Sequence, residues 1–359
     1  MAWSARDHWA AKLAFACGPN RAAELLASMD PAAIPEEARA FDSEAEEKAL
    51  AALGGRLVLR GSPEYPPQLE RIFDPPLVLY VRGRLPVRAP VAFVGARNAT
   101  PHGLRMARRL AGDAAVAGVC VVSGLARGID AASHQAALGV GGETVAVLGT
   151  GVERIYPEEN RGLAERVLAA GGGLVSEMPR LTRPTRDVFP RRNRVVSGIS
   201  FATVVVEGAD NSGSLITANH ALDQGRELMA VPGPADAPTS HVPHRLISEG
   251  AKLVTKAEHI IESLPEEAIP LLDPLWRAAP EAAPQAAPTT SEEGRILALL
   301  GSDALSLDEL MALSGLDTSA ISSIMFGLEI KERITLLPGQ RYAQKAARRK
   351  EARQDPQGS

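Results

Sequence analysis

Short apolar runs alternate with amphipathic segments through the middle of the chain. Six runs are apolar almost throughout, as expected of strands buried on both faces of a parallel sheet. They begin at Val91, Val119, Thr144, Gly173, Thr203 and Leu228. Between the first two runs, apolar residues recur at helical spacing, at Leu104, Ala107, Leu110, Ala111 and Ala114. The pattern predicts an α/β fold, an extended Rossmann-like, doubly wound parallel sheet over residues 56–263, opened by a short strand from Arg56 to Leu59.

The flanking segments have different patterns. In residues 1–55 Leu13, Ala22 and Leu25 have helical spacing, which predicts a small helical domain of the SAM-like kind that serves for packing. Residues 264–289 are rich in proline and alanine and are expected to form a semi-rigid linker.

The C-terminal part, residues 290–345, is expected to fold as a winged helix. Capping boxes at Thr290–Glu293 and Ser306–Glu309 open two helices, a third helix follows, and residues 334–343 have the pattern of a hairpin. The charged tail, residues 346–359, is expected to be disordered. Neither this domain nor residues 1–55 combines arginine with an aromatic residue in a loop, so both are expected to be accessory to any binding of a polyanion.

Composition limits the possible functions. The chain has 359 residues, enough for two or three domains, and a net charge of −4, so a nucleic-acid surface has to be a local patch. Two cysteines, Cys17 and Cys120, make neither a disulfide framework nor a zinc site. No signal peptide and no apolar run of membrane-spanning length is present, so we expect a cytoplasmic protein without a membrane partner.

One such basic patch lies between Arg180 and Arg194, where Asp187 is the single acidic residue. Its arginines are Arg180, Arg183, Arg186, Arg191, Arg192 and Arg194. Phe189 lies in this segment, which the pattern assigns to a loop. Single-stranded nucleic acid is held by cations and by stacking on aromatic rings, but a buried core phenylalanine fits the sequence equally well.

Glycine-containing loops follow several of the predicted strands, at Gly95, at Gly124, at Gly149 and between Glu207 and Ser214. Ligands of doubly wound sheets bind at these strand ends, where backbone amides favour anions. After Gly149-Thr150-Gly151 the third glycine of a dinucleotide fingerprint is replaced by Arg154, so nicotinamide and flavin cofactors are disfavoured. That loop is either a tight turn or an anion site.

The other loops supply the candidate binding residues. Gly95-Ala96-Arg97 places an arginine at the end of the first parallel strand, and Ser212-Gly213-Ser214 opens a helix with small residues that suit a phosphate. In the Gly124 loop, Asp130 is expected to cap the helix or orient Arg127, with a catalytic acid as the lesser alternative.

Together with further motifs, these residues resemble the DNA-processing protein A (DprA/Smf) family. The similarity extends from about Tyr65 to Val254 and includes Gly95-Ala96-Arg97, Ser123 to Asp130, Tyr156-Pro157, Phe189-Pro190 with Arg192-Asn193-Arg194, and Ser212 to Leu215. Ser240 to His244 departs from the family pattern because it lacks the usual glycine and asparagine.

The resemblance implies a homodimeric single-stranded-DNA-binding protein of natural transformation, DNA uptake and recombination. Such a protein protects incoming strands and loads a RecA-type recombinase, without catalysis, cofactor or metal. The implied DNA-binding residues are Gly95, Ala96, Arg97, Gly124, Arg127, Arg186, Phe189, Arg191, Arg192, Asn193, Arg194, Ser212, Gly213 and Ser214.

Two alternatives remain at this point. A phosphoribohydrolase on a related sheet needs a glutamate on the helix after its glycine loop, whereas this chain has Leu215, Ile216 and Thr217 there. A transcription regulator would read DNA with the third winged-helix segment, but only Lys331 and Arg333, near its end, are basic.

Overall fold

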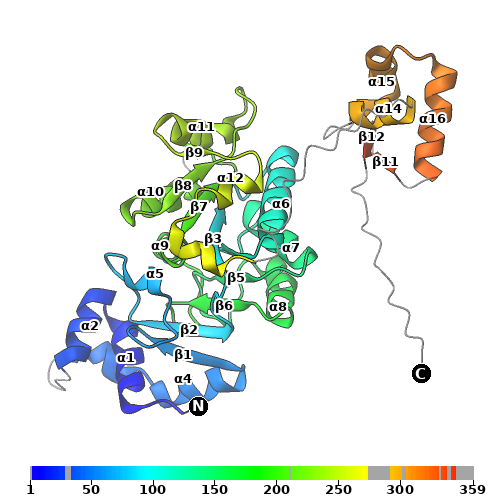
Figure 1. Cartoon of the computed structure of the whole chain (residues 1–359). Coiled ribbons are helices and arrows are strands. Elements are labelled where there is room, and N and C mark those ends of the chain that lie inside the picture. Colours follow the sequence, from blue (N-terminus) through cyan, green and yellow to red (C-terminus); the bar gives the residue numbers. More distant parts are fainter. Residues whose placement is uncertain are drawn as a thin grey trace, which may run out of the picture. The chain divides into compact units, whose positions relative to one another are not determined.

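The computed structural model describes residues 2–28, 34–210, 212–273, 292–300, 305–330, 333–337 and 341–344. The chain forms two compact units, Met1–Ala279 and Pro280–Ser359 (Figure 1). The expected boundary between residues 1–55 and the sheet domain stays a prediction, because both segments belong to one compact unit.

The first unit is built on a nine-stranded sheet with the order β1-β2-β6-β5-β4-β3-β7-β8-β9. Its strands are β1 (Gly55–Leu59), β2 (Val78–Gly83), β3 (Ala89–Val94), β4 (Val119–Ser123), β5 (Thr144–Val147), β6 (Gly173–Ser176), β7 (Ala202–Val205), β8 (Glu227–Ala230) and β9 (Lys252–Leu253). The strands from β6 to β9 are parallel, which confirms the predicted doubly wound sheet. Two antiparallel strands, β1 and β2, extend it at the β6 edge.

Helices cover both faces of this sheet (Figure 1). One face carries α6 (Pro101–Val116), α7 (Ile129–Gly139), α8 (Arg161–Ala169), α12 (Ala257–Ile261) and the 3-10 helix η4 (Glu266–Leu271). The other carries α5 (Pro67–Glu70), α9 (Val188–Ile199), α10 (Gly213–Asp223) and α11 (His241–Ser248). Every residue of β3 is buried, with Phe93 packed among residues of the first face and Val94 among those of the second. The short 3-10 helices η2 (Glu158–Asn160) and η3 (Pro238–Ser240) lie in connecting loops.

The N-terminal helices pack onto the antiparallel edge of the sheet. They are α1 (Ala5–Ala16), α2 (Pro19–Ser28), α3 (Glu36–Ala40) and α4 (Ser43–Ala52). Leu13 of α1, Leu25 of α2 and Leu50 of α4 share an apolar cluster with Tyr80 of β2. The predicted helices thus form a layer over β1 and β2.

The expected linker begins with packed residues. Ala268 and Leu272 are buried against the α6 face of the sheet, and the Asp273 amide donates to the Ala117 carbonyl at 3.1 Å. Residues 274–289 and the tail, 346–359, lie outside the described residues.

The second unit has the elements expected of a winged helix. Helices α14 (Glu292–Leu300), α15 (Leu307–Ser314) and α16 (Thr318–Ile330) accompany a small sheet of β10 (Leu305–Ser306), β11 (Ile334–Leu337) and β12 (Arg341–Gln344). The capping box of Ser306 and Glu309 is present, whereas Thr290 of the other expected box lies outside the described residues. No single described helix has the length and apolarity to cross a membrane; α15 and Thr318–Glu329 pass that test only as a pair bent by 115°.

Candidate nucleic-acid interface

A cavity of about 480 Å³ opens at the carboxyl ends of β3, β4 and β7. The strand order reverses here, because the chain runs from β3 to β4, β5 and β6 on one side and returns to β7 on the other. Such a switch point is the usual ligand site of a doubly wound sheet. Its lining includes the predicted residues Gly95, Ala96, Arg97, Gly124, Arg192, Asn193, Ser212, Gly213 and Ser214.

Two further cavities, of about 250 and 470 Å³, adjoin the first. Arg97 lines all three, and Phe189 and Tyr156 line both of the additional ones. The predicted residues Arg127 and Arg186 line one each. We call these three adjoining cavities the groove.

Two of the glycine loops are already filled by carboxylates. Glu207, at the end of β7, accepts a hydrogen bond from the Thr100 amide at 2.9 Å and thereby occupies the N-terminus of α6. A Cβ atom at Gly103 would lie 2.1 Å from the carboxyl carbon of Glu207, so a larger residue there would displace this carboxylate. Asp130 accepts from the amides of Gly124 at 3.0 Å and Ala126 at 3.2 Å. The carboxylates of Glu207 and Asp130 thus occupy the amides of Thr100, Gly124 and Ala126, which a dinucleotide phosphate would need.

The N-terminus of α10 is different. Its N-cap residue, Ser212, makes no side-chain capping bond, and Gly213 and Ser214 face the largest cavity of the groove. An α-helix carries partial positive charge at this end. The first turn of α10 consequently presents partial positive charge to the groove, and binding of a phosphate there stays a prediction.

The predicted arginines fall into two groups. Arg97, Arg127 and Arg186 are exposed and line the groove. The partner of Arg127 is Glu159, with 2.6 Å between Nε and Oε1, and not Asp130, so the expected orientation of Arg127 by Asp130 is wrong. Asp130 is turned toward the amides of its own loop.

Arg192 belongs to the second, buried group. Its Nη1 donates to the carbonyls of Gly124 at 2.5 Å and Val147 at 2.6 Å, beneath the groove. Burial lowers the pKa of its guanidinium to about 10, partly offset by Asp130, so the group stays charged at neutral pH. A Cβ atom at Gly124 would lie 2.1 Å from this Nη1, which explains the glycine.

Arg194 is also buried, and it does not line the groove. It donates to the Asp74 carbonyl at 2.8 Å and pairs with the carboxylates of Asp74 and Glu177. The exposed Arg191 approaches the same Glu177, with 3.6 Å between Nε and Oε1, and lies outside the groove as well. The structure brings neither Arg191 nor Arg194 to the other candidate residues.

Phe189 lies in the first turn of α9, and not in the loop that the sequence pattern indicated. The ring is half-buried, so it is neither a full core residue nor a free platform. The Arg97 guanidinium carbon lies 5.4 Å from the Phe189 ring centroid, within cation–π range. The Tyr156 ring also contacts Phe189, with the ring centroids 5.5 Å apart and the planes tilted by 42°.

Tyr156 is absent from the predicted site residues, although its Tyr-Pro motif belongs to the family resemblance. The only local signal is its position in the loop that follows β5, where the fold collects ligand-binding residues. Its 43% exposure and its contact with Phe189 make it part of the groove. The sequence could not pair the two rings, because 33 positions separate them.

His134 is the remaining titratable group near this edge. It is fully buried on α7, and its Nδ1 lies 2.7 Å from the Thr144 hydroxyl oxygen. Burial lowers its pKa to about 3, so it stays neutral and is shut off from the groove. In the described residues, no group of three or more histidine, cysteine, aspartate or glutamate side chains could hold a metal ion.

Comparisons with known proteins give a consistent result. Residues 56–265 match the family described as DNA recombination-mediator protein A, and residues 280–340 match the DprA winged helix domain. Protein Smf of Escherichia coli is 47% identical over 210 residues, which are 58% of this chain and 56% of that protein. The DNA processing protein DprA of Bacillus subtilis is 42% identical over 216 residues, 59% of this chain and 72% of that protein.

Solved structures agree with the fold. DNA processing protein A from Streptococcus pneumoniae superposes with a TM-score of 0.60 at 32% identity, covering 68% of this chain and 86% of that one. DNA processing protein A from Helicobacter pylori has the same fold, with a TM-score of 0.52 at 24% identity, 58% of this chain and 94% of that one. The family's description is that of a recombination mediator and not of an enzyme, as the sequence predicted. The chain belongs to the DNA recombination-mediator protein A family and carries that family's winged-helix domain.

Proposed function

We propose that this chain binds single-stranded DNA along the groove, protects incoming strands during natural transformation and helps to load a RecA-type recombinase on them. The observation that carries the proposal is the combination in one groove of exposed arginines, two neighbouring aromatic rings and an uncapped helix N-terminus. The arginines and the helix N-terminus suit phosphates, and the aromatic rings suit unpaired bases.

The phosphate contacts are assigned to Arg97, Arg186 and the first turn of α10. No described residue forms a hydrogen bond or ion pair with the Arg97 or Arg186 side chain, so both guanidinium groups are available to an incoming oxyanion. Arg127 can join them by giving up its exposed pair with Glu159, since such surface pairs contribute little. The buried Arg192 guanidinium adds positive charge at the floor of the groove while its Nη1 donates to the carbonyls of Gly124 and Val147.

The preference for single strands rests on Phe189 and Tyr156. A base can stack on a ring only when its face is open, and in a duplex both faces are covered by neighbouring bases. Stacking on an aromatic side chain contributes roughly 1–3 kcal/mol per base and tolerates any sequence. We therefore assign the groove to single strands with little sequence preference.

Hydrolysis finds little support in this groove. Among the described residues that line it, the single carboxylate is Asp130, and that group accepts two backbone hydrogen bonds. Burial raises its pKa, against the opposing effects of Arg192 and of these amides. The recombinase partner and the homodimer rest on membership of the family.

A salt titration of binding to oligothymidine tests the proposal, with duplex of equal length and nucleotide hydrolysis as controls. We expect tighter binding of the single strand, no hydrolysis, no need for metal, and a linear fall of log affinity with log salt. Arg97→Ala and Arg186→Ala should each weaken binding and lower the slope by about 0.7. Equal affinity for duplex, or wild-type binding by both variants, would refute the assignment.

A further inference from the structure

Two loops form the wall of the groove that carries Tyr156 and Arg186. They are residues 149–157, after β5, and residues 179–187, between β6 and α9. The Gly151 amide donates to the Thr182 carbonyl at 3.2 Å, and the Glu153 amide donates to the Arg180 carbonyl at 3.2 Å. A Cβ atom at Gly151 would lie 2.1 Å from the Pro179 carbonyl oxygen, so their contact requires glycine. We call this bonded pair the paired loops.

The far side of the paired loops is buried against the N-terminal helices. Val152 has no exposed surface and belongs to the apolar cluster that Leu13, Leu25 and Leu50 form over β2. This valine is the only residue of either loop in that cluster of described residues. Val152 thus packs the loop after β5 against the N-terminal helices α1, α2 and α4.

A buried ionic group makes a second attachment. Glu46 of α4 accepts from the Arg180 amide, with 2.7 Å to Oε1, and its Oε2 lies 3.1 Å from Arg180 Nε. Arg180 also pairs with Glu153 of the other loop. The exposed fractions of the Glu46 and Arg180 side chains are 9% and 17%. Loss of Glu46 would leave the buried Arg180 guanidinium with Glu153 as its one remaining ion-pair partner, and weakening a buried ion pair is costly.

We propose that the N-terminal helices control the groove through these attachments, with Glu46 and Arg180 as positioning residues for Arg186 and Tyr156. The inference rests on the proposed function. Tyr156 follows Glu153 by three residues and Arg186 follows Arg180 by six, so each lies a short stretch of chain from its anchor. Without the anchors, both groups have to be ordered again when a strand binds, and this lost entropy appears as weaker binding.

This inference changes the expectation that residues 1–55 are accessory. They touch no part of the groove themselves, since its lining residues begin at Val94. Their effect on binding is transmitted through Glu46, Val152 and the paired loops. Any ligand that displaces α4 would release both loops together, which makes this contact a place for regulation.

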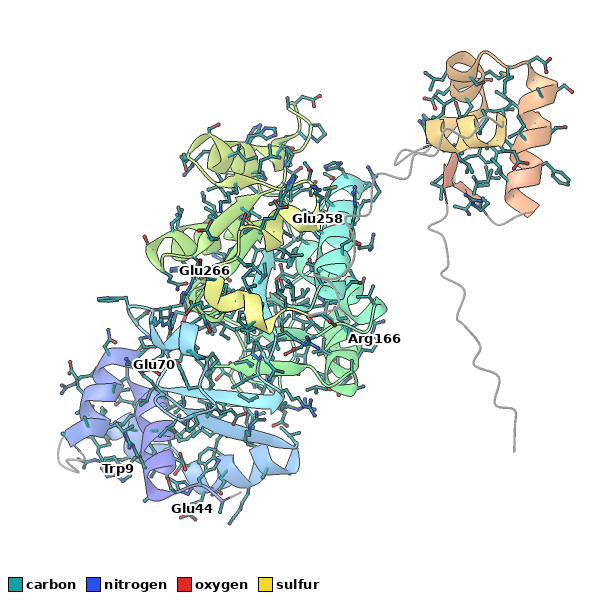
Figure 2. All side chains as sticks on the ribbon, viewed as in Figure 1. Trp9, Glu44, Glu70, Arg166, Glu258 and Glu266 are labelled. Atoms are coloured by element: carbon teal, nitrogen blue, oxygen red, sulfur yellow. The ribbon has the colours of Figure 1, made fainter. Side chains whose placement is uncertain are left out.

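The test uses the full chain with Glu46→Gln and, as matched control, Glu44→Gln, an exposed acid on the same helix (Figure 2). Oligothymidine affinity is measured at several salt concentrations beside a melting curve. We expect Glu46→Gln to weaken binding several-fold and to lower the salt slope by up to about 0.7, as loss of one phosphate contact does. Glu44→Gln should match wild type in both. A purely structural role for Glu46 would lower the melting temperature and leave the slope unchanged.

The double variant Glu46→Gln with Arg186→Ala decides whether the effect passes through Arg186. We expect the double variant to bind only slightly more weakly than Arg186→Ala, because the positioned guanidinium is already gone and only the effect on Tyr156 remains. Full additivity of the two losses would overturn the inference. Should Glu46→Gln fail to fold, Arg180→Lys takes its place, since it keeps the charge and loses the Nε contact.

Two further outcomes separate this inference from the proposed function. If the wild-type protein does not bind oligothymidine, the proposed function is refuted. If the wild-type protein binds and Glu46→Gln binds equally well, only the positioning role is refuted.

Discussion

Replacing Arg194 with alanine separates the two groups of arginines. In the structure this side chain is about 5% exposed and pairs with Glu177, which is about 6% exposed, and with Asp74. Burial raises the pKa of Glu177, while Arg194 and Arg191 favour its charged form. Without Arg194 the Glu177 carboxylate keeps only its 3.6 Å approach to the exposed Arg191.

Removing one partner of a buried ion pair typically costs about 3–5 kcal/mol of stability. A domain of this size loses roughly 2–4 °C of melting temperature per kcal/mol, so Arg194→Ala should melt roughly 10 °C below wild type. Because the side chain lies outside the groove, the folded variant should retain the wild-type salt slope. Arg97→Ala should do the reverse, with an unchanged melting temperature and a slope lower by about 0.7.

The assay is a thermal melt of each variant, followed by an oligothymidine salt titration well below its melting temperature. If Arg194→Ala melts like wild type and lowers the slope as Arg97→Ala does, Arg194 contacts the strand and the burial argument fails. If both variants lose stability and keep their slopes, the groove does not bind phosphate.

Three further predictions follow from the same geometry. Phe189→Ala should weaken oligothymidine binding by roughly 1–3 kcal/mol. It should cost less stability than the roughly 3–5 kcal/mol lost when a core phenylalanine is replaced by alanine. A large fall in melting temperature with unchanged affinity would reject stacking. Glu159→Gln should free Arg127 and tighten binding by up to about fivefold, the equivalent of a surface ion pair, and weaker binding would contradict this. Burial lowers the pKa of His134 to about 3 in the native protein. Below about pH 6.5 this histidine is therefore protonated in the unfolded chain and neutral in the native protein. The free energy of unfolding should therefore fall on acidification, by about 2 kcal/mol between pH 6.5 and 5. Urea unfolding at both pH values measures this fall, and His134→Asn should remove the part that is due to His134.

The sequence determined the sheet and the position of the groove. Strands such as Val91–Val94 are apolar throughout, and such short apolar runs between amphipathic segments predict strands buried between two layers of helices. Glycine after a strand marks a close turn, so Gly95 and Gly124 already located the carboxyl edge. The capping box at Ser306 is likewise a local signal, because its two hydrogen bonds join residues three apart.

The tertiary structure decided which arginines face the groove. Arg192 is turned inward by carbonyls 68 and 45 positions away, at Gly124 and Val147, and Arg194 by the carboxylate of Glu177. Nothing in the segment between Arg180 and Arg194 separates these two from Arg186, since all carry the same charge and the distinguishing partners lie on other strands and loops. The contact of Tyr156 with Phe189 and the anchoring of Arg180 by Glu46 are of the same kind. Burial and ion pairing depend on groups that only folding brings together, so a local pattern locates a basic segment but cannot assign its individual side chains.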